Sequence, residues 1–257
     1  MASEERFGYE WDTYDAMTPE YEAQFRNWTA PIPEEEWKGK RVLDAGSGMG
    51  RNSVWPLKWE ASELVAFDLD DRSVAAAKRT LEQFKNARVE KINIHEIPFR
   101  SEFDVAFSIG VIHHLEDPQK ALRGMVEALA PSGTLLVWVY SREGFEWIPD
   151  YVDPIRNILT SRLPLPLVHA LSYLCSVPLF CFVKIFRGPS GYFKQLSTFK
   201  FWHLHSIVFD QLLPRIAHYW TKDEVRSLVD GLPLSGIEVI RPANDCGWIL
   251  FAKKSAS

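Results

Sequence analysis

The chain has 257 residues, of which 46% are hydrophobic and 25% are charged, a composition that excludes a disordered protein. Its formal net charge is −5 at pH 7, and no stretch concentrates lysine and arginine, which argues against a dedicated nucleic-acid-binding protein. The three cysteines, Cys175, Cys181 and Cys246, lack the paired spacing of a zinc site, so we expect no disulfide framework, no metal and a cytoplasmic location.

From Lys40 onward, short apolar runs alternate with longer helical patterns, the rhythm of βαβ units in a parallel sheet. The expected strands are 41–44, 64–68, 89–94, 103–109 and 134–139. The expected helices are 72–85, opened by Asp70 and Asp71, and 118–129, where Asp117 precedes a proline in the favourable first helical position. Pro131-Ser132-Gly133 is expected to turn the chain into the fifth strand.

After Tyr140 the alternation stops, and it resumes with a threonine-capped helix at 221–230 and strands at 237–240 and 248–252. A sheet is therefore completed late, around an insertion. We expect four parts, which are an N-terminal helical cap (1–39), a nucleotide-binding core (40–140), a helical insertion (141–220) and a segment that completes the sheet (221–257).

The insertion contains the apolar run LPLPLVHALSYLCSVPLFCFVKIF at residues 163–186. Too few residues separate His169 from Lys184 to cross a hydrocarbon layer of about 30 Å, and Pro178 is expected to interrupt the helix. We therefore expect a pair of buried lid helices rather than a membrane span. The alternative is a hairpin that contacts a membrane surface through 163–186, with its basic residues at the headgroups, namely Arg162, Lys184, Arg187 and Lys194.

The strongest motif is VLDAGSGMGRN at residues 42–52, in which an apolar strand ends in Asp44 and leads directly into glycines. Glycine allows a tight turn and lets a ligand lie against the backbone. The spacing G-x-G-x-G after an aspartate suits an amino-acid nucleoside better than a pyrophosphate, for which G-x-G-x-x-G is typical. The candidate cofactor-binding residues of this segment are Asp44, Gly46, Ser47, Gly48 and Gly50.

A second carboxylate, Asp68, ends the apolar strand 64–67 about twenty residues after the glycine loop. The two oxygens of a carboxylate match the vicinal hydroxyl groups of a ribose, so this position predicts a nucleoside. Asp70 and Asp71 fit a helix-capping role better.

Two further segments, NIHEIPF (93–99) and FDVAFSIGVIHHLEDP (103–118), resemble the class I S-adenosylmethionine (SAM) dependent methyltransferase family. Together with the earlier motifs and APSGTLLVWVY (130–140), the resemblance covers residues 40–140 densely and fades within the insertion. It implies SAM as cofactor and S-adenosylhomocysteine as product. It also implies a Rossmann-like α/β fold, with a seven-stranded mostly parallel sheet, helices on both faces, an antiparallel last strand and the insertion after strand five.

The resemblance also implies cofactor contacts outside the glycine loop. Asn93 stands where the family usually has an aspartate for the adenine amino group, and its side-chain oxygen can accept the same hydrogen bond. Leu69, Ile94 and Ile109 fall beside the cofactor by position. Tyr14, or its neighbours Tyr9 and Trp11, would line the methionine end from a leading helix, although core packing explains these aromatic residues equally well.

Five residues are candidates for the acceptor side of the reaction, namely His113, His114, Asp210, His218 and Tyr219. The first two follow strand four, at the carboxyl edge where open α/β sheets bind ligands, so either could serve as a base. Packing under the cofactor and helix capping is the simpler explanation. The others lie with His203 and His205 in a segment rich in large apolar residues, where a substrate pocket or mutual hydrogen bonds would supply their partners.

The sequence thus predicts a SAM-dependent methyltransferase that acts on a small, apolar acceptor and not on nucleic acid. Orientation of the reactants and exclusion of water would carry most of the catalysis. Two alternatives remain, a membrane-associated methyltransferase of a lipid or prenylated acceptor and a SAM-binding partner protein without catalysis. A nicotinamide-dependent oxidoreductase is disfavoured because no tyrosine has a lysine four residues on. The acceptor, the methylated atom and the oligomeric state are not predicted.

Overall fold

The computed structural model describes residues 20–144, 163–186 and 191–256, together with positions 146, 148, 150, 153 and 156. Tyr9, Trp11 and Tyr14 lie outside the described residues. The helices are α2 (Glu20–Trp28), α3 (Val54–Lys58), α4 (Asp71–Leu81), α5 (Pro118–Ala128), α7 (Leu165–Phe186), α8 (Gly191–Thr198), α9 (Phe201–Leu212) and α10 (Lys222–Ser227), with short 3-10 turns η1 (Glu34–Trp37), η2 (Ile94–Glu96) and η3 (Ile112–His114). The strands are β1 (Arg41–Ala45), β2 (Glu63–Asp68), β3 (Ala87–Lys91), β4 (Phe103–Ile109), β5 (Leu129–Val139), β6 (Leu234–Ile240) and β7 (Trp248–Lys254).

The seven strands form one sheet in the order β3-β2-β1-β4-β5-β7-β6. Strands β1 to β5 pair in parallel, and β7 lies antiparallel between β5 and β6. The predicted fold class, including the antiparallel last strand, is confirmed. Four of the five residues of β1 are buried, because helices cover both faces of a parallel sheet.

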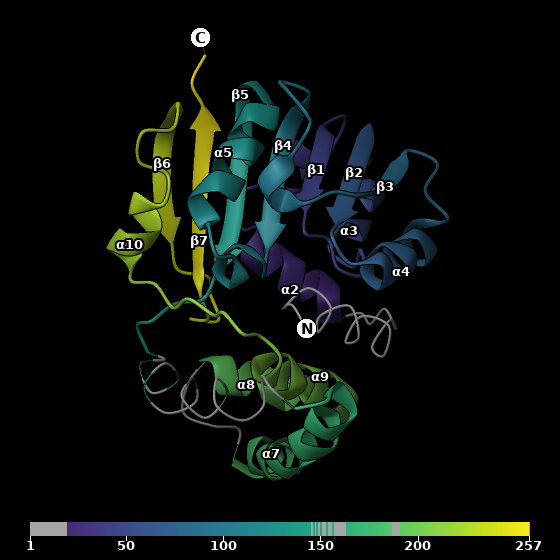
Figure 1. Ribbon diagram of the computed structural model, residues 1–257, viewed down its shortest axis with the longest axis vertical. Coiled ribbons are helices and arrows are strands. Elements are labelled where there is room, and N and C mark those ends of the chain that lie inside the picture. Colours follow the sequence, from purple (N-terminus) through teal and green to yellow (C-terminus); the bar gives the residue numbers. More distant parts are fainter. Residues whose placement is uncertain are drawn as a thin grey trace.

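Two apolar cores lie on opposite faces of the sheet. Side chains of neighbouring strand residues point to opposite faces, so they pack in different cores. Leu43 packs in the core under α5 and α10, whereas Val42 packs in the core formed with α2 and α3. The second core is dominated by aromatic rings, including Phe25 of α2 and Trp37 of η1, whose centroids are 5.6 Å apart. Figure 1 shows α5 and α10 on the viewer's side of the sheet.

Three predicted helix caps are confirmed. The Asp70 side chain accepts hydrogen bonds from the Arg72 and Ser73 backbone, and Asp117 accepts one from Lys120. Thr221 forms a capping box with Glu224, in which each side chain bonds the backbone N–H of the other. These caps satisfy amide groups that have no partner within the helix, so local chemistry fixes where each helix begins.

Several predicted boundaries are wrong by a few residues. Strand β3 ends at Lys91 rather than at residue 94, because Asn93 accepts a hydrogen bond from the His95 backbone and begins η2. Helix α4 ends at Leu81 rather than at residue 85. Strand β5 begins at Leu129 and includes the expected turn, with Ser132 at a positive φ of 62° and an irregular register against β4.

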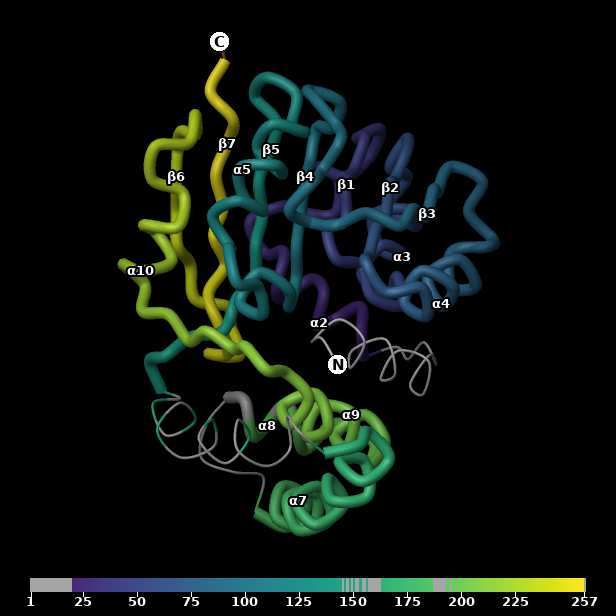
Figure 2. Tube along the Cα trace, in the orientation of Figure 1, coloured from purple at the N-terminus to yellow at the C-terminus, as the bar shows by residue number. Residues whose placement is uncertain are grey.

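The insertion leaves and rejoins the core at one point. Ser141 and Trp220 form an isolated parallel bridge, in which the Arg142 N–H donates to the Trp220 carbonyl at 2.9 Å. Figure 2 shows the two chain segments converging below β5 and β7. Helices α7, α8 and α9 form a layer beyond the carboxyl ends of the parallel strands (Figure 1).

The expected interruption at Pro178 and the expected burial of the lid helices are both wrong. Helix α7 runs without a break through Pro178, and only 22% of its apolar window is buried. Pro178 has no backbone N–H, so the carbonyl of Leu174, four residues earlier, lacks its usual donor within the helix. Both residues lie on the exposed side of α7, where water can donate to this carbonyl instead. Its inner side packs antiparallel against α9, with Val168 beside Phe209 and Val183 beside Leu204.

Candidate functional site

The glycine loop is tied to the end of the neighbouring strand β2. The N–H groups of Gly46 and Ser47 both donate to the Phe67 carbonyl, at 3.0 and 2.9 Å, and the Gly48 N–H donates to Asp68 Oδ2 at 3.0 Å. Gly46, Gly48 and Gly50 have φ angles of 80°, 54° and 79°, which disfavour any other residue. A Cβ atom on Gly46 would also lie 2.6 Å from Val111 Cγ2, so the turn requires glycine for space as well.

Asp44 lies at the base of this loop and is only 1% exposed. Its Oδ2 accepts a hydrogen bond of 2.6 Å from the Ser53 hydroxyl. Burial raises the pKa of Asp44 to about 7, partly offset by the Ser53 hydrogen bond and reinforced by the negative charge of Asp68. A cationic ligand placed here would hold the carboxylate ionised.

Asp68 ends β2 beside the loop, with a carboxylate oriented by backbone amides. Besides the bond from Gly48, Oδ1 accepts a hydrogen bond of 3.1 Å from the Asp70 N–H. Burial raises the pKa of Asp68, and the backbone hydrogen bonds from Asp70, Gly48 and Leu69 act in the opposite direction. Each carboxylate oxygen has a further lone pair, so Asp68 is a fixed acceptor that can still bind a pair of hydroxyl groups.

Two features of the described residues fit a nucleoside cofactor beside these aspartates. The Ser47 hydroxyl is buried and has no hydrogen-bond partner among the described residues. A polar group of a bound ligand would supply that partner. Leu69, next to Asp68, is 37% exposed and is the single exposed large apolar side chain of the described core, where a flat base would cover it. Ile94 and Ile109 are buried at the ends of their segments, and Asn93 Oδ1 already accepts one backbone hydrogen bond.

The structure brings the five acceptor-side candidates together around Tyr140, the residue that follows β5. The His113 ring lies 3.8 Å from the Tyr140 ring and 4.2 Å from that of His114. Tyr219 stacks on Tyr140 at 5.3 Å. The Tyr140 hydroxyl donates to Asp210 Oδ2 at 3.2 Å, and the His218 N–H donates to the His113 carbonyl at 2.8 Å.

Burial disfavours the charged forms of His113 and His114. It lowers the pKa of His114 to about 3, and it lowers that of His113 well below the ordinary value with a further contribution from the charge of His114. His114 Nδ1 donates to the Ile216 carbonyl at 2.8 Å, whereas both ring nitrogens of His113 are buried without a partner in the described part of the chain. Neutral imidazoles of such low basicity bind by hydrogen bonding and take up few protons near pH 7.

Sequence reasoning missed three residues that complete this cluster, Tyr140, Gln211 and Arg156. Gln211 Nε2 donates to the Tyr140 hydroxyl at 2.8 Å, and the Tyr219 hydroxyl donates to Gln211 Oε1 at 3.2 Å. The Arg156 guanidinium is 1% exposed and pairs with Asp153 at 2.8 Å. The place of Tyr140 at the carboxyl end of a parallel strand was the signal that could have identified it.

A second contact joins the insertion to the cofactor side. His203 of α9 lies edge-on to Tyr21 of α2 at 4.9 Å, and the Arg51 guanidinium, just after the glycine loop, lies 5.0 Å from the Tyr21 ring centroid. Burial lowers the pKa of His203 to about 4, with a contribution from the charge of Arg51. Helix α9 therefore bridges the cofactor loop and the Tyr140 cluster.

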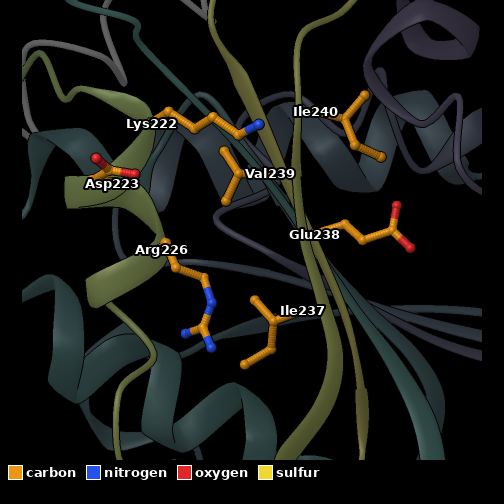
Figure 3. A pocket seen from close by; sticks show the side chains of 7 residues that line it. All are labelled: Lys222, Asp223, Arg226, Ile237, Glu238, Val239 and Ile240. Atoms are coloured by element: carbon orange, nitrogen blue, oxygen red, sulfur yellow. The ribbon is translucent and has the colours of Figure 1, made fainter.

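A separate hollow lies beside the border strand β6. Figure 3 shows it between α10 and β6, where it is lined by Lys222, Asp223, Arg226, Ile237, Glu238, Val239 and Ile240. Strand β6 is at the border of the sheet, and β7, β5 and β4 separate it from β1 and the glycine loop. This hollow is therefore separate from the glycine loop and Asp68.

Residues 43–137, which contain the glycine loop, Asp68 and the β4 edge, match the family model of the methyltransferase domain. The core of this chain belongs to the class I SAM-dependent methyltransferase family. A solved SAM-dependent methyltransferase from Aquifex aeolicus shares the fold, with a TM-score of 0.53 and 15% identity over 93% of this chain and 100% of that one. The cofactor of the domain is SAM.

Curated relatives of this methyltransferase core act on different acceptors. A ubiquinone biosynthesis O-methyltransferase from Cereibacter sphaeroides is 29% identical over 52% of this chain and 58% of that protein. A tRNA U34 carboxymethyltransferase from Pseudoalteromonas translucida is 28% identical over 46% of this chain and 38% of that protein. The chain thus spans about half the length of the curated relatives it matches, and its insertion has to be interpreted from its own structure.

Proposed function

We propose that this protein is an active methyltransferase that transfers the methyl group of SAM to a small, apolar acceptor held between the sheet edge and α9. One observation carries the proposal. The described part of the insertion encloses the carboxyl edge of the sheet and meets it through the Tyr140 cluster, on the side where the glycine loop and Asp68 also end.

The cofactor would be held by residues of the core alone. Asp68 would bind the ribose hydroxyl groups, Leu69 would cover one side of the adenine, and Asn93 would lie near its amino group. Gly46, Ser47 and Gly48 would bind the amino-acid end, with Asp44 below it supplying negative charge. Bound there, SAM supplies an electrophilic methyl group, and the chain's own task is to orient the acceptor towards it.

The acceptor would lie against the Tyr140 cluster. Its rings, contributed by His113, Tyr140 and Tyr219, offer a wall of aromatic faces, whose polar atoms are the two tyrosine hydroxyl groups and the His113 ring nitrogens. Asp210 and Gln211 hold the Tyr140 hydroxyl from the insertion side, so the wall is fixed before an acceptor binds. A buried wall of this kind excludes water and selects a compact apolar molecule over a polyanion.

A nucleic-acid acceptor is disfavoured by charge. The chain has a net charge of −5, and the glycine loop adjoins two carboxylates, the buried Asp44 and the partly buried Asp68, rather than a basic track. A SAM-binding partner protein without catalysis is the second alternative, and formation of S-adenosylhomocysteine separates it from an enzyme. The three free cysteines support a reducing compartment, and we propose that the reaction takes place in the cytoplasm.

Two measurements test this function. Calorimetry should detect SAM at micromolar strength, about −8 kcal/mol, and should detect no heat with NAD. Incubation with methyl-labelled SAM and a fractionated cell extract should place the label in the small, solvent-extractable fraction. Label in the RNA fraction would overturn the proposed acceptor class, and SAM binding without any methylated product would favour the partner protein.

A further inference from the structure

The described residues expose eight large apolar side chains, and seven of them lie on α7 and α9. Three of the seven are far out in solvent, with Leu174 at 72%, Ile185 at 70% and Phe186 at 67% exposed. Figure 1 places α7 at the end of the molecule opposite the sheet. The outer apolar face, as we call this set, consists of Leu167, Leu174, Val177, Phe182, Ile185, Phe186 and Trp202.

The opposite side of α7 already has its partners. Val168, Ser172, Ser176 and Val183 are buried against α8 and α9, and the Ser176 hydroxyl lies 2.7 Å from His205 Nδ1. Helix α7 is therefore held in place without its outer apolar face. Soluble proteins seldom expose apolar side chains so densely unless another surface covers them.

The later part of the insertion, residues 163–220, differs in charge from the rest of the chain. Residues 163–220 contain five basic residues and one acidic residue, a net charge of +4 within a chain of net charge −5. The one carboxylate, Asp210, accepts a hydrogen bond from Tyr140 on the core side of α9. The lysines Lys184, Lys194 and Lys200 are exposed. Lys184 directly precedes Ile185, and Lys200 lies two residues before Trp202.

We propose that the outer apolar face docks on an anionic lipid bilayer, with α7 lying in the plane of the interface. Apolar side chains flanked by lysine and tryptophan match the boundary between acyl chains and negatively charged headgroups. A second copy of this chain fits less well, because residues 163–220 carry a net charge of +4 in each copy and like charges repel.

The geometry favours docking over crossing, although α7 is long and apolar enough to span a membrane by length and composition. Helix α7 packs antiparallel along α9, which has only 12 residues, and the two share the contact between Ser176 and His205. Both ends of the insertion meet at the Ser141–Trp220 bridge. A crossing α7 would have to abandon these contacts or draw a polar pair into hydrocarbon.

Docking does not depend on methyl transfer, since none of the residues in the outer apolar face belongs to the cofactor site or the Tyr140 cluster. A consequence for the acceptor rests on the proposed function. With α7 on the bilayer, α9 lies between the lipid and the sheet edge, so an acceptor drawn from the membrane would have to pass beside α9 to reach the Tyr140 cluster.

Flotation of the full chain with lipid vesicles, without SAM, tests the docking. We expect the protein to float with vesicles of phosphatidylcholine and phosphatidylglycerol and to bind them much more weakly in high salt. The double variant Lys194→Glu/Lys200→Glu should bind at least about 25-fold more weakly, since each lysine near such a surface is worth roughly a fivefold change. The matched variant Lys78→Glu/Lys85→Glu, with the same charge change around α4, should bind almost like the wild type.

A native thiol reports whether the outer apolar face itself is the contact. Cys181 is exposed and lies seven residues after Leu174 and four before Ile185, on the same side of α7. In a Cys175→Ser variant, a nitrobenzoxadiazole label reacts with Cys181 rather than with Cys246, because burial raises the pKa of the Cys246 thiol to about 12. Anionic vesicles should shift the emission of this label to the blue.

Three results would overturn the proposal. Dimerisation through the same face in sedimentation, without binding to anionic vesicles, would make a second copy the occupant. Vesicle binding without any change at Cys181 would assign docking to another surface. If the Lys78→Glu/Lys85→Glu variant loses as much vesicle affinity as the Lys194→Glu/Lys200→Glu variant, binding depends on the total charge of the protein and not on this surface. None of these results bears on SAM binding or on S-adenosylhomocysteine formation, so the proposed function is tested separately.

Discussion

Asp44 and Asp68 stand at the ends of neighbouring strands, yet they meet different surroundings. Asp68 accepts backbone hydrogen bonds from Gly48 and Asp70, which stabilise its charged form. Asp44 accepts a hydrogen bond from the Ser53 hydroxyl and is more completely buried. Asp44 is therefore the carboxylate whose charge depends most on pH and on what binds above it.

The affinity for SAM should depend on pH through Asp44. With a pKa of about 7 in the free protein, Asp44 is mostly protonated at pH 6 and mostly ionised at pH 8. A cationic ligand binds the ionised form, so calorimetry should show about tenfold tighter SAM binding at pH 8 than at pH 6. The Asp44→Asn variant controls for ionisation of SAM itself, and an equal pH dependence in both proteins would assign the effect to the ligand.

The same carboxylate should destabilise the protein without ligand at high pH. A buried acid whose folded pKa is raised favours folding in its protonated form, and this advantage is lost as pH rises from its unfolded pKa of about 3.9 towards 7. We expect Asp44→Asn to raise the free energy of unfolding by on the order of 2–4 kcal/mol at pH 8 and hardly at all at pH 3.5. Denaturant melts at both pH values would measure this, and a gain that does not grow with pH would contradict it.

Replacing Asp68 by alanine should weaken SAM binding by about 1.5–3 kcal/mol, because charge-assisted hydrogen bonds to the ribose are lost. Asp71→Ala is the matched control, since this carboxylate is exposed and pairs only with Lys91 on the surface. Calorimetry of the two variants makes the comparison. Equal affinity in both would move the ribose contact away from Asp68.

The residues of the cofactor loop could be predicted from sequence because their chemistry is local. Glycines at positive φ and an aspartate at a strand end form a sequence pattern that spans only a few neighbouring positions. The contact between Tyr140 and Gln211 joins residues 71 positions apart and depends on how the insertion folds back. No short-range pattern encodes such a pair, which is why both residues were missed.

Among the elements, α9 holds the insertion against the core at two points. His203 contacts Tyr21 near the glycine loop, and Asp210 and Gln211 hold the Tyr140 hydroxyl at the end of β5. Helix α7 packs on the far side of α9, and the two core contacts described above all come from α9. Changes at α9 should therefore affect the acceptor side before they affect cofactor binding.

Tyr140→Phe should impair the acceptor side of the site without affecting SAM binding. The change leaves the partly buried Asp210 and Gln211 without their shared hydroxyl, at a cost of about 1–3 kcal/mol, or roughly 3–10 °C in Tm. We expect turnover to fall sharply while SAM affinity stays within about twofold, because the ribose and glycine-loop contacts are untouched. Thermal melts, calorimetry and S-adenosylhomocysteine formation provide the three measurements.

Tyr173→Phe is the matched control for this change, since Tyr173 lies on α7 and its hydroxyl makes no hydrogen bond among the described residues. It should alter neither Tm nor turnover appreciably. If both tyrosine variants lose turnover equally, the Tyr140 hydroxyl has no special place in the acceptor site.

The elements of the core were predictable and those of the insertion were not, for a physical reason. Strands that are buried on both faces and helices with capped ends carry their pattern in sequence. In the insertion, apolar residues occur on both sides of α7, so no periodicity separates its inner and outer faces. Pro178 was expected to end a helix that in fact continues, since packing of α7 on α9 outweighs the local cost of proline.

At the scale of the whole molecule, the cofactor contacts belong to one body and the outer apolar face to another. The sheet and its helices carry Asp44, the glycine loop and Asp68, while α7 lies beyond α9 (Figure 1). Ligand binding at the sheet edge should thus stabilise the core directly. Its effect on the stability of α7 should be transmitted only through α9.

S-adenosylhomocysteine at about 100 times its Kd should add roughly 2.7 kcal/mol of stability, or about 5–10 °C in Tm, whereas NAD should add none. Hydrogen exchange should then slow most in the glycine loop and at Asp68–Asp70, where the Gly48 and Asp70 amides donate to the Asp68 carboxylate that we propose binds the ribose. Exchange along α7 should change little, because its inner side is already packed and its outer side touches no cofactor. Stronger protection of α7 than of the glycine loop would mean that the insertion closes on the cofactor itself, and the acceptor site would then have to lie outside α9.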